Sequence, residues 1–137
     1  MTSSSPDVHP RSRIAWIALV IVLVVEVVGG LAVLIPVVQG FFGATGDPIE
    51  QRLSIFLSAL IAWVWVIITL WGALRSRASW VRGSAITIHI LLFAAGTGVL
   101  QFGLAEPLVG WMLILLAFAG FAAALIARPM VREPEEG

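Results

Sequence analysis

Residues 14–38 read IAWIALVIVLVVEVVGGLAVLIPVV, an apolar run of 25 residues interrupted by one ionisable side chain, Glu26, at its midpoint. A helix needs about 20 apolar residues to cross the hydrocarbon of a bilayer, whereas a membrane strand needs about 10 and alternates polar with apolar side chains. This run does not alternate. It is also longer than the apolar segment of a cleavable signal peptide, and no small-residue cleavage site follows it closely. We therefore expect a retained transmembrane helix.

Three further apolar runs, bounded by charges, prolines and glycines, follow at residues 53–74, 83–101 and 108–127. Each is close to or above the length that spans a bilayer. The pattern predicts an all-α membrane protein with a four-transmembrane-helix bundle at residues 14–128. The flanking segments, 1–13 and 129–137, are polar and contain proline, so we expect disordered tails there.

The composition agrees with a membrane protein. Of the 137 residues, 60% are hydrophobic and 12% are charged, whereas charged residues make up about 25% of a soluble protein. The mean hydropathy is +1.04. Cysteine is absent, which excludes disulfides, thiolate metal sites and cysteine nucleophiles. Lysine, asparagine and tyrosine, whose codons are AT-rich, are also absent, so we infer a GC-rich bacterial genome as the source.

The arginines predict the orientation of the four helices. Seven of the eight fall on one side of the predicted bundle, at Arg11, Arg13, Arg75, Arg77, Arg82, Arg128 and Arg132. Only Arg52 falls on the other side. Because cytoplasmic loops of membrane proteins carry the excess of basic residues, we expect both termini and the 75–82 loop in the cytoplasm. The chain is then a multi-pass protein of the cell (inner or plasma) membrane, and the 75–82 loop anchors on anionic headgroups.

Helix starts are marked on the opposite side. Asp47, Pro48 and Glu50 are typical of an N-cap, a proline in the first turn and an acidic residue after it. Glu106 and Pro107 repeat the pattern before the last apolar run. We therefore expect Asp47 and Glu106 to cap the second and fourth helices.

The tryptophans divide into two groups. Four lie near the predicted water–lipid boundaries and indicate an aromatic belt: Trp16, Trp71, Trp80 and Trp111. Trp63 and Trp65 lie in the middle of a predicted span, where their ring N–H groups need partners or a wet region. They predict either a groove for an apolar ligand such as a quinone or lipid, or ordinary packing.

Glu26 is the residue that most demands an explanation, because an ionisable side chain at that depth is costly and marks a functional candidate. Burial favours its neutral form, so a neighbour or an incoming cation could change its protonation. One hypothesis is a carboxyl that handles protons or cations. The other is a hydrogen bond between helices, worth about 0.6–2 kcal/mol. Gly29 and Gly30 lie on the same face and would let another backbone approach.

His89 is the histidine that falls inside a predicted span. Its depth is about 14 Å counted from Trp80, against about 18 Å for Glu26 counted from Ile14. The two side chains are therefore able to pair across the first and third helices. The alternative is a neutral histidine bonded to a backbone carbonyl or a hydroxyl. No metal or haem site is expected, because such sites use clustered ligands and His9 lies in the tail.

Small residues predict the packing faces of the last two helices. One face of the fourth helix carries Gly110, Ala117, Gly120, Ala124 and Ala127. The third helix has Ala94 and Gly98 four residues apart, which is a similar signature of close helix approach. Thr87 and Thr97 are further polar candidates in the third helix.

Two resemblances bear on function. A central glutamate, Glu26, followed by Gly29 in the first of four helices resembles the small multidrug resistance transporters. This resemblance implies exchange of protons for cationic drugs within a dimer. The chain departs from that family in its greater length, its first outer loop of 14 residues (39–52) and its single arginine-defined orientation. The stretches 96–101 and 110–129 resemble small four-helix membrane proteins of high-GC Gram-positive bacteria, a resemblance that implies no activity.

No phosphate-binding loop, dinucleotide fingerprint, nucleophile elbow or zinc-protease helix motif occurs in the sequence. The leading hypothesis is a non-enzymatic accessory, scaffolding or assembly subunit without a cofactor. Its partners are the lipid bilayer and a larger membrane protein or a second copy, not nucleic acid. The alternatives are a proton-coupled small-molecule transporter that uses Glu26 and a lipid- or quinone-binding protein.

Overall fold

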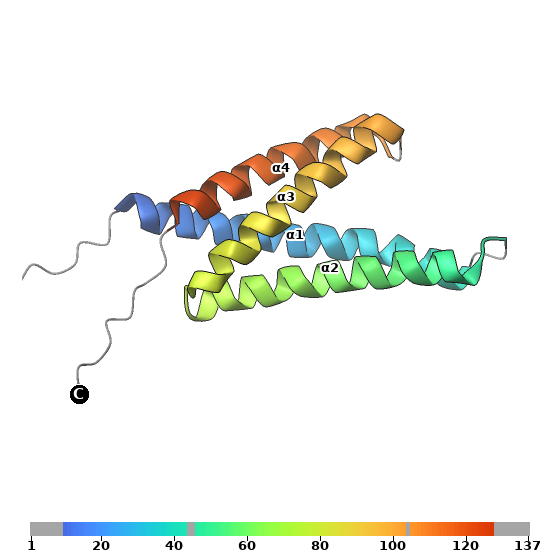
Figure 1. Ribbon diagram of the computed structural model, residues 1–137, viewed down its shortest axis with the longest axis horizontal. Helices are drawn as coiled ribbons and strands as arrows, with labels where there is room; N and C mark the ends of the chain where they lie inside the picture. Colours follow the sequence, from blue (N-terminus) through green and yellow to red (C-terminus); the bar gives the residue numbers. More distant parts are fainter. Residues whose placement is uncertain (1–9, 44–45, 104, 128–137) are drawn as a thin grey trace, which may run out of the picture.

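The computed structural model describes residues 10–43, 46–103 and 105–127. These residues form four α-helices (Figure 1): α1 (Pro10–Gly43), α2 (Ile49–Arg75), α3 (Ser79–Phe102) and α4 (Pro107–Ile126). Each is long and apolar enough to cross a membrane. The all-α, four-helix prediction is therefore confirmed for this part of the chain. The predicted tails at 1–9 and 129–137 lie outside the described residues.

The helix α1 is longer than its apolar run. It begins at Pro10, so residues 10–13 are helical and not part of a disordered tail. It ends at Gly43 instead of residue 38, because Phe41 stacks on Phe56 of α2 at 5.2 Å and its carbonyl accepts a hydrogen bond from Arg52 at 3.0 Å. The first connection is therefore residues 44–48, not 14 residues. The hydropathy of the sequence predicts only the apolar part of α1. Its C-terminal end depends on contacts with α2, which hydropathy does not describe.

The starts of the later helices follow the proline signals in part. Helix α2 begins at Ile49 with Pro48 as its N-cap, so Asp47 does not have the predicted capping position. Helix α4 begins at Pro107 with Glu106 as its N-cap, as predicted. Neither N-cap makes a side-chain capping hydrogen bond.

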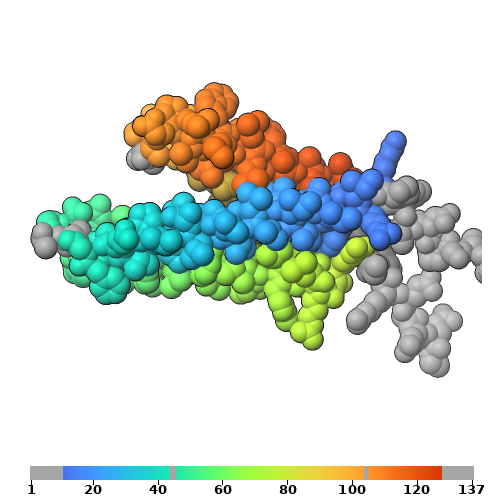
Figure 2. Space-filling model, turned by 180° about the vertical axis from the view of Figure 1, so that it is seen from behind, coloured from blue at the N-terminus to red at the C-terminus, as the bar shows by residue number. Residues whose placement is uncertain are grey.

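The four helices form two hairpins, α1–α2 and α3–α4, which cross at an angle (Figure 1). They meet at the end that holds the first turns of α1 and the last turns of α4, and they separate toward the α1–α2 and α3–α4 connections. From behind, Figure 2 shows the α3–α4 hairpin diverging from the later half of α1. Helix α4 lies against α1, whereas no described Cα atom of α3 is within 8 Å of one in α1. The bundle is closed at one end only.

The shared core occupies the closed end. Its buried residues come from all four helices: Ala15, Trp16, Leu19, Leu23, Ala73, Val81, Ala85, Ala123, Ala124 and Ala127. Alanines at this position let the helix backbones approach closely. Trp16 is only 3% exposed and its ring Nε1 donates to the Ala73 carbonyl at 3.2 Å. The prediction that Trp16 belongs to an aromatic belt is therefore wrong, whereas the other three predicted belt tryptophans are exposed.

Arg82 ties the two ends of the second hairpin together. From the first turn of α3, its Nε donates to the Ala124 carbonyl at 3.0 Å and its Nη2 donates to the Leu125 carbonyl at 3.0 Å. The last carbonyls of a helix lack partners within the helix and attract positive charge. Arg82 therefore caps the C-terminal end of α4. The sequence had suggested only headgroup anchoring for this residue.

Candidate functional site: the Glu26–His89 pair

Glu26 is buried one turn beyond Leu23, the last residue of α1 that belongs to the shared core. Leu23, one turn earlier, and Leu19, two turns earlier, are fully buried in the shared core. Glu26 continues this buried side, and Gly29 and Val33 beyond it are exposed. Helical periodicity places residues three and four apart on one face. Glu26 therefore lies at the edge of the shared core.

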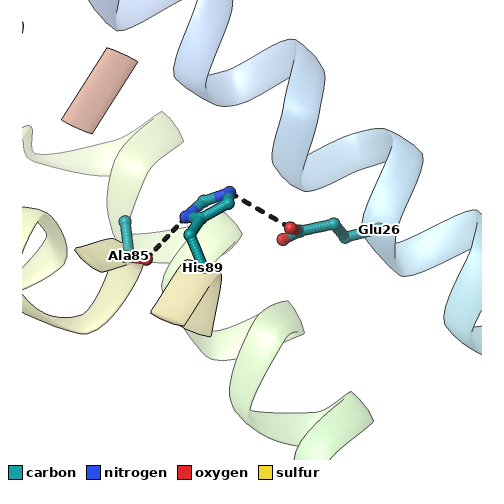
Figure 3. Close-up of polar contacts among 3 residues, drawn as sticks. All are labelled: Glu26, Ala85 and His89. Carbon is teal, nitrogen blue, oxygen red and sulfur yellow. Dashed lines mark hydrogen bonds and ion pairs between the residues drawn. The ribbon is translucent and has the colours of Figure 1, made fainter. Parts of the chain in front are cut away.

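His89 of α3 reaches across to Glu26 (Figure 3). Its Nε2 lies 3.1 Å from Glu26 Oε1, and the two side chains are 0% and 5% exposed, respectively. Its Nδ1 lies 2.6 Å from the Ala85 carbonyl, one turn earlier in α3. Both sequence hypotheses for His89, the pairing with Glu26 and the bond to a backbone carbonyl, thus apply at once.

Gly120 of α4 makes room for the imidazole. A Cβ atom added at Gly120 would collide with Nε2, Cδ2 and Cε1 of His89. The imidazole is therefore held between Glu26 of α1 and the bare backbone of α4. Three helices build the site, and the glycine is required because the ring occupies the volume of a side chain.

The Ala85 carbonyl decides which imidazole nitrogen carries a hydrogen. A carbonyl only accepts hydrogen bonds, so Nδ1 must be the donor in this contact. In a neutral imidazole the other nitrogen, Nε2, then presents its lone pair to Glu26. Apart from each other, Nε2 and Glu26 Oε1 have no hydrogen-bond partner among the described residues. Glu26 Oε2 has none there either.

A second polar cluster joins α2 to α3. Thr69, which is fully buried, donates from Oγ1 to the Trp65 carbonyl at 2.9 Å and lies 2.7 Å from Ser84 Oγ. Because the one hydroxyl hydrogen of Thr69 is used, Ser84 must be the donor to Thr69. The Trp65 ring then donates from Nε1 to Ser84 Oγ at 2.8 Å. These bonds form a satisfied network, which the sequence did not indicate.

The two mid-span tryptophans both have partners. Trp63 donates from Nε1 to the Val27 carbonyl at 2.9 Å, and its ring lies against Gly30. Trp65 is bonded to Ser84 as described above. A ligand groove that relies on a free N–H of either ring is therefore not formed in the part of the chain that the structure describes.

The small residues of α4 lie at helix contacts. All five members of the predicted face are buried: Gly110, Ala117, Gly120, Ala124 and Ala127. Gly110 meets Gly96 of α3, where a Cβ added to Gly96 would lie 2.9 Å from the Gly110 carbonyl oxygen. The sequence alone did not single out Gly96, because Ala94 and Gly98 have the same four-residue spacing of small residues.

Some of the predicted polar and small residues make no contact with another helix of this chain in the described residues. No described atom lies within 4 Å of a Cβ added at Gly29 or at Gly98, and Ala94 is exposed. Neither Gly29 nor the Ala94–Gly98 pair therefore supports close packing within this chain. Thr87 and Thr97 bond back to carbonyls of their own helix, at Gly83 and Phe93.

An apolar groove lies beside the site. It has a volume of about 180 Å³ and runs between α3 and α4, where it is lined by His89, Ile90, Phe93, Ala117, Phe118 and Phe121. Both imidazole nitrogens are engaged elsewhere, so the groove offers hydrocarbon contacts and no free donor.

Within residues 10–43, 46–103 and 105–127, no group of three or more His, Cys, Asp or Glu side chains is placed to hold a metal ion. Comparison of the chain with protein-family models, curated proteins and solved structures found no match.

Proposed function

We propose that the chain is a multi-pass protein of the cell membrane with both termini in the cytoplasm, and that it works as a non-enzymatic assembly or accessory subunit. The four apolar helices and the arginine distribution support the placement. In this orientation the closed end of the bundle is cytoplasmic and the hairpins separate toward the outer side.

The observation that carries the proposal is the uncovered backbone on both hairpins. Gly29 of α1 and Gly98 of α3 have open space where a side chain would be. Glycines on a membrane helix allow another helix to pack closely. The Glu26 and His89 side chains meanwhile contact each other. This arrangement favours a transmembrane helix of a partner protein as the ligand.

Co-purification from the native membrane in mild detergent tests the proposal. We expect a stoichiometric membrane partner that is lost from Gly29→Leu and Gly98→Leu, because the added side chains meet nothing in this chain but would block a packed helix. Gly83→Leu is the matched control, since Gly83 also has open space but lies at the closed end. A monomer under all conditions would contradict the proposal.

Proton-coupled transport of a small molecule is the second candidate. It is favoured by the position of Glu26, whose Oε2 lacks a protein partner among the described residues and which lies one turn beyond Leu23, at the edge of the shared core. The test is the uptake of lipophilic cations into proteoliposomes, driven by an imposed proton gradient. The wild type should accumulate a cation and Glu26→Gln should not. Background uptake by the wild type for every cation excludes this candidate.

Lipid binding is a third candidate, and the groove between α3 and α4 favours it over a site at Trp63 or Trp65. The groove is lined by Phe93, Phe118 and Phe121 and lacks a free donor, so it suits an acyl chain better than a quinone headgroup. Native mass spectrometry would show a retained lipid. Phe118→Ala should reduce this retention, and unchanged retention would argue against the groove.

A further inference from the structure

We propose that Glu26 and His89 together bind one exchangeable proton, held on the Glu26 carboxyl and donated to His89 Nε2, and that this proton keeps the α3–α4 hairpin against α1. The proposal goes beyond an assembly role, because it assigns a ligand and a charge state to the pair.

The pair is electrostatically isolated. The sequence contains no ionisable side chain between residues 53 and 74 of α2 or along α4. Residues 14–43 of α1 contain one, Glu26, and residues 83–102 of α3 contain one, His89. From α2, the Trp63 ring donates to the carbonyl of Val27, next to Glu26, and the Thr69 hydroxyl is already bonded. From α4, Gly120 faces the His89 ring. Arg82 is bonded to carbonyls of α4 at the closed end. Within the four described helices, no other ionisable side chain is shown in contact with the pair.

Counting protons leaves one favourable state. With Nδ1–H committed to the Ala85 carbonyl, a pair without the proton is a carboxylate 3.1 Å from the Nε2 lone pair, which is repulsive and has a net charge of −1. With two protons the pair has a charge of +1 in apolar surroundings. With one proton it is neutral and attractive. Because an uncompensated charge is costly both in lipid and in a protein interior, the one-proton state is the stable one.

The unpartnered Oε2 places that proton on the glutamate. A buried carboxylate is tolerated when further hydrogen bonds satisfy its oxygens. No described group donates to Oε2, and Oε1 faces only His89. A carboxylic acid needs fewer donors than a carboxylate and supplies one itself. The relay therefore runs from the Glu26 O–H to His89 Nε2, and from His89 Nδ1–H to the Ala85 carbonyl.

The proton has a mechanical consequence because the pair bridges helices that are otherwise apart. No described Cα atom of α3 is within 8 Å of one in α1, and Glu26–His89 is a direct side-chain contact between these two helices at the edge of the shared core. The pair also lies one turn beyond the shared core, whose last members on α1 and α3 are Leu23 and Ala85. Loss or gain of a proton leaves a net charge at this point, and we expect the two hairpins to move apart there.

Spectroscopy on the full chain in liposomes tests where the proton resides. At near-neutral pH we expect the infrared carbonyl band of a protonated carboxylic acid, lost in Glu26→Gln and kept in Glu50→Gln, which removes an exposed carboxyl. In a His9→Gln background, ¹⁵N spectra should show His89 neutral with its hydrogen on Nδ1. A doubly protonated His89 without the carboxylic acid band overturns the proposal. The ¹⁵N readout needs no variant of the site, so it holds even where Glu26→Gln does not fold.

A distance measurement tests the mechanical part. Since the chain lacks cysteine, spin labels can be attached uniquely at Phe42→Cys and Leu108→Cys, two exposed positions at the separated ends of α1 and α4. We expect the distance to increase at alkaline pH in the wild type. Glu26→Gln imitates the protonated carboxyl, so its distance should not respond. An identical response in both proteins would overturn the proposed role of the proton.

Discussion

At the scale of single residues, the structure gives the buried Glu26 carboxyl a defined partner, His89. The Ala85 carbonyl fixes the imidazole tautomer, and the pairing atoms of Glu26 and His89 are 3.1 Å apart. A contact of this kind inside a membrane bundle is worth about 1 kcal/mol. The approximate depths of Glu26 and His89 could be predicted from the sequence. The tautomer of His89 could not, because it depends on the position of the Ala85 carbonyl in the folded helix.

A double-mutant cycle measures the pair. For Glu26→Ala and His89→Ala we expect a coupling free energy of about 0.6–1.7 kcal/mol in the free energy of unfolding in detergent or lipid. Glu50→Ala combined with His89→Ala is the control, and its coupling should be zero because Glu50 is exposed at the start of α2. A zero coupling between Glu26 and His89 would show that their contact does not stabilise the bundle.

Gly120 offers a sharper test at the same scale. Gly120→Ala places a Cβ inside the volume of the His89 ring, and overpacking of this kind costs about 1–3 kcal/mol of unfolding free energy. The cost should fall in a His89→Ala background, because the ring is gone. Gly83→Ala is the control, since nothing lies within 4 Å of its added Cβ. Equal costs of Gly120→Ala with and without the ring would contradict the packing described here.

At the scale of helices, Arg82 caps the C-terminal end of α4, a role that its position next to a basic loop did not indicate. Its guanidinium bonds two carbonyls at the end of α4, so it joins the start of α3 to the end of its hairpin partner. Hydrogen bonds to a charged group contribute about 1.5–3 kcal/mol. The end of α4 is therefore held by a side chain more than forty residues earlier in the sequence.

Arg82→Gln should loosen the last turn of α4. We expect faster amide hydrogen exchange there and a loss of about 1–3 kcal/mol in unfolding free energy, since the two carbonyls lose a charged donor. Arg75→Gln is the control, because Arg75 is exposed and contacts the Trp71 ring at 5.1 Å. If both variants speed exchange equally in α4, the capping role of Arg82 is wrong.

At the scale of the whole molecule, the two hairpins close at one end and separate at the other. Their core is rich in alanine at the closed end, and Glu26 and His89 lie where that core stops. The proposed orientation predicts which end meets the cytoplasm, because the 75–82 loop carries arginines and the 44–48 connection does not.

Cysteine labelling checks this orientation. In the cysteine-free chain, Ser76→Cys should react with a membrane-impermeant maleimide only after the cells are opened, and Gly46→Cys should react in intact cells. Both positions are exposed. The reverse pattern would invert the topology. Reaction of both sites in intact cells would indicate a chain that inserts in both directions.

The sequence by itself determined the number and approximate places of the helices and the polar residues within them. Length and hydropathy are local properties, so four apolar runs were enough to predict four helices. The tertiary structure decided which residues meet. Glu26 contacts His89, Trp16 is buried and Gly29 is exposed, because these outcomes depend on how each helix is rotated and crossed. Helices that are apolar on nearly every side carry little information about rotation, so small residues, side-chain hydrogen bonds and the crossing of the hairpins select the partners.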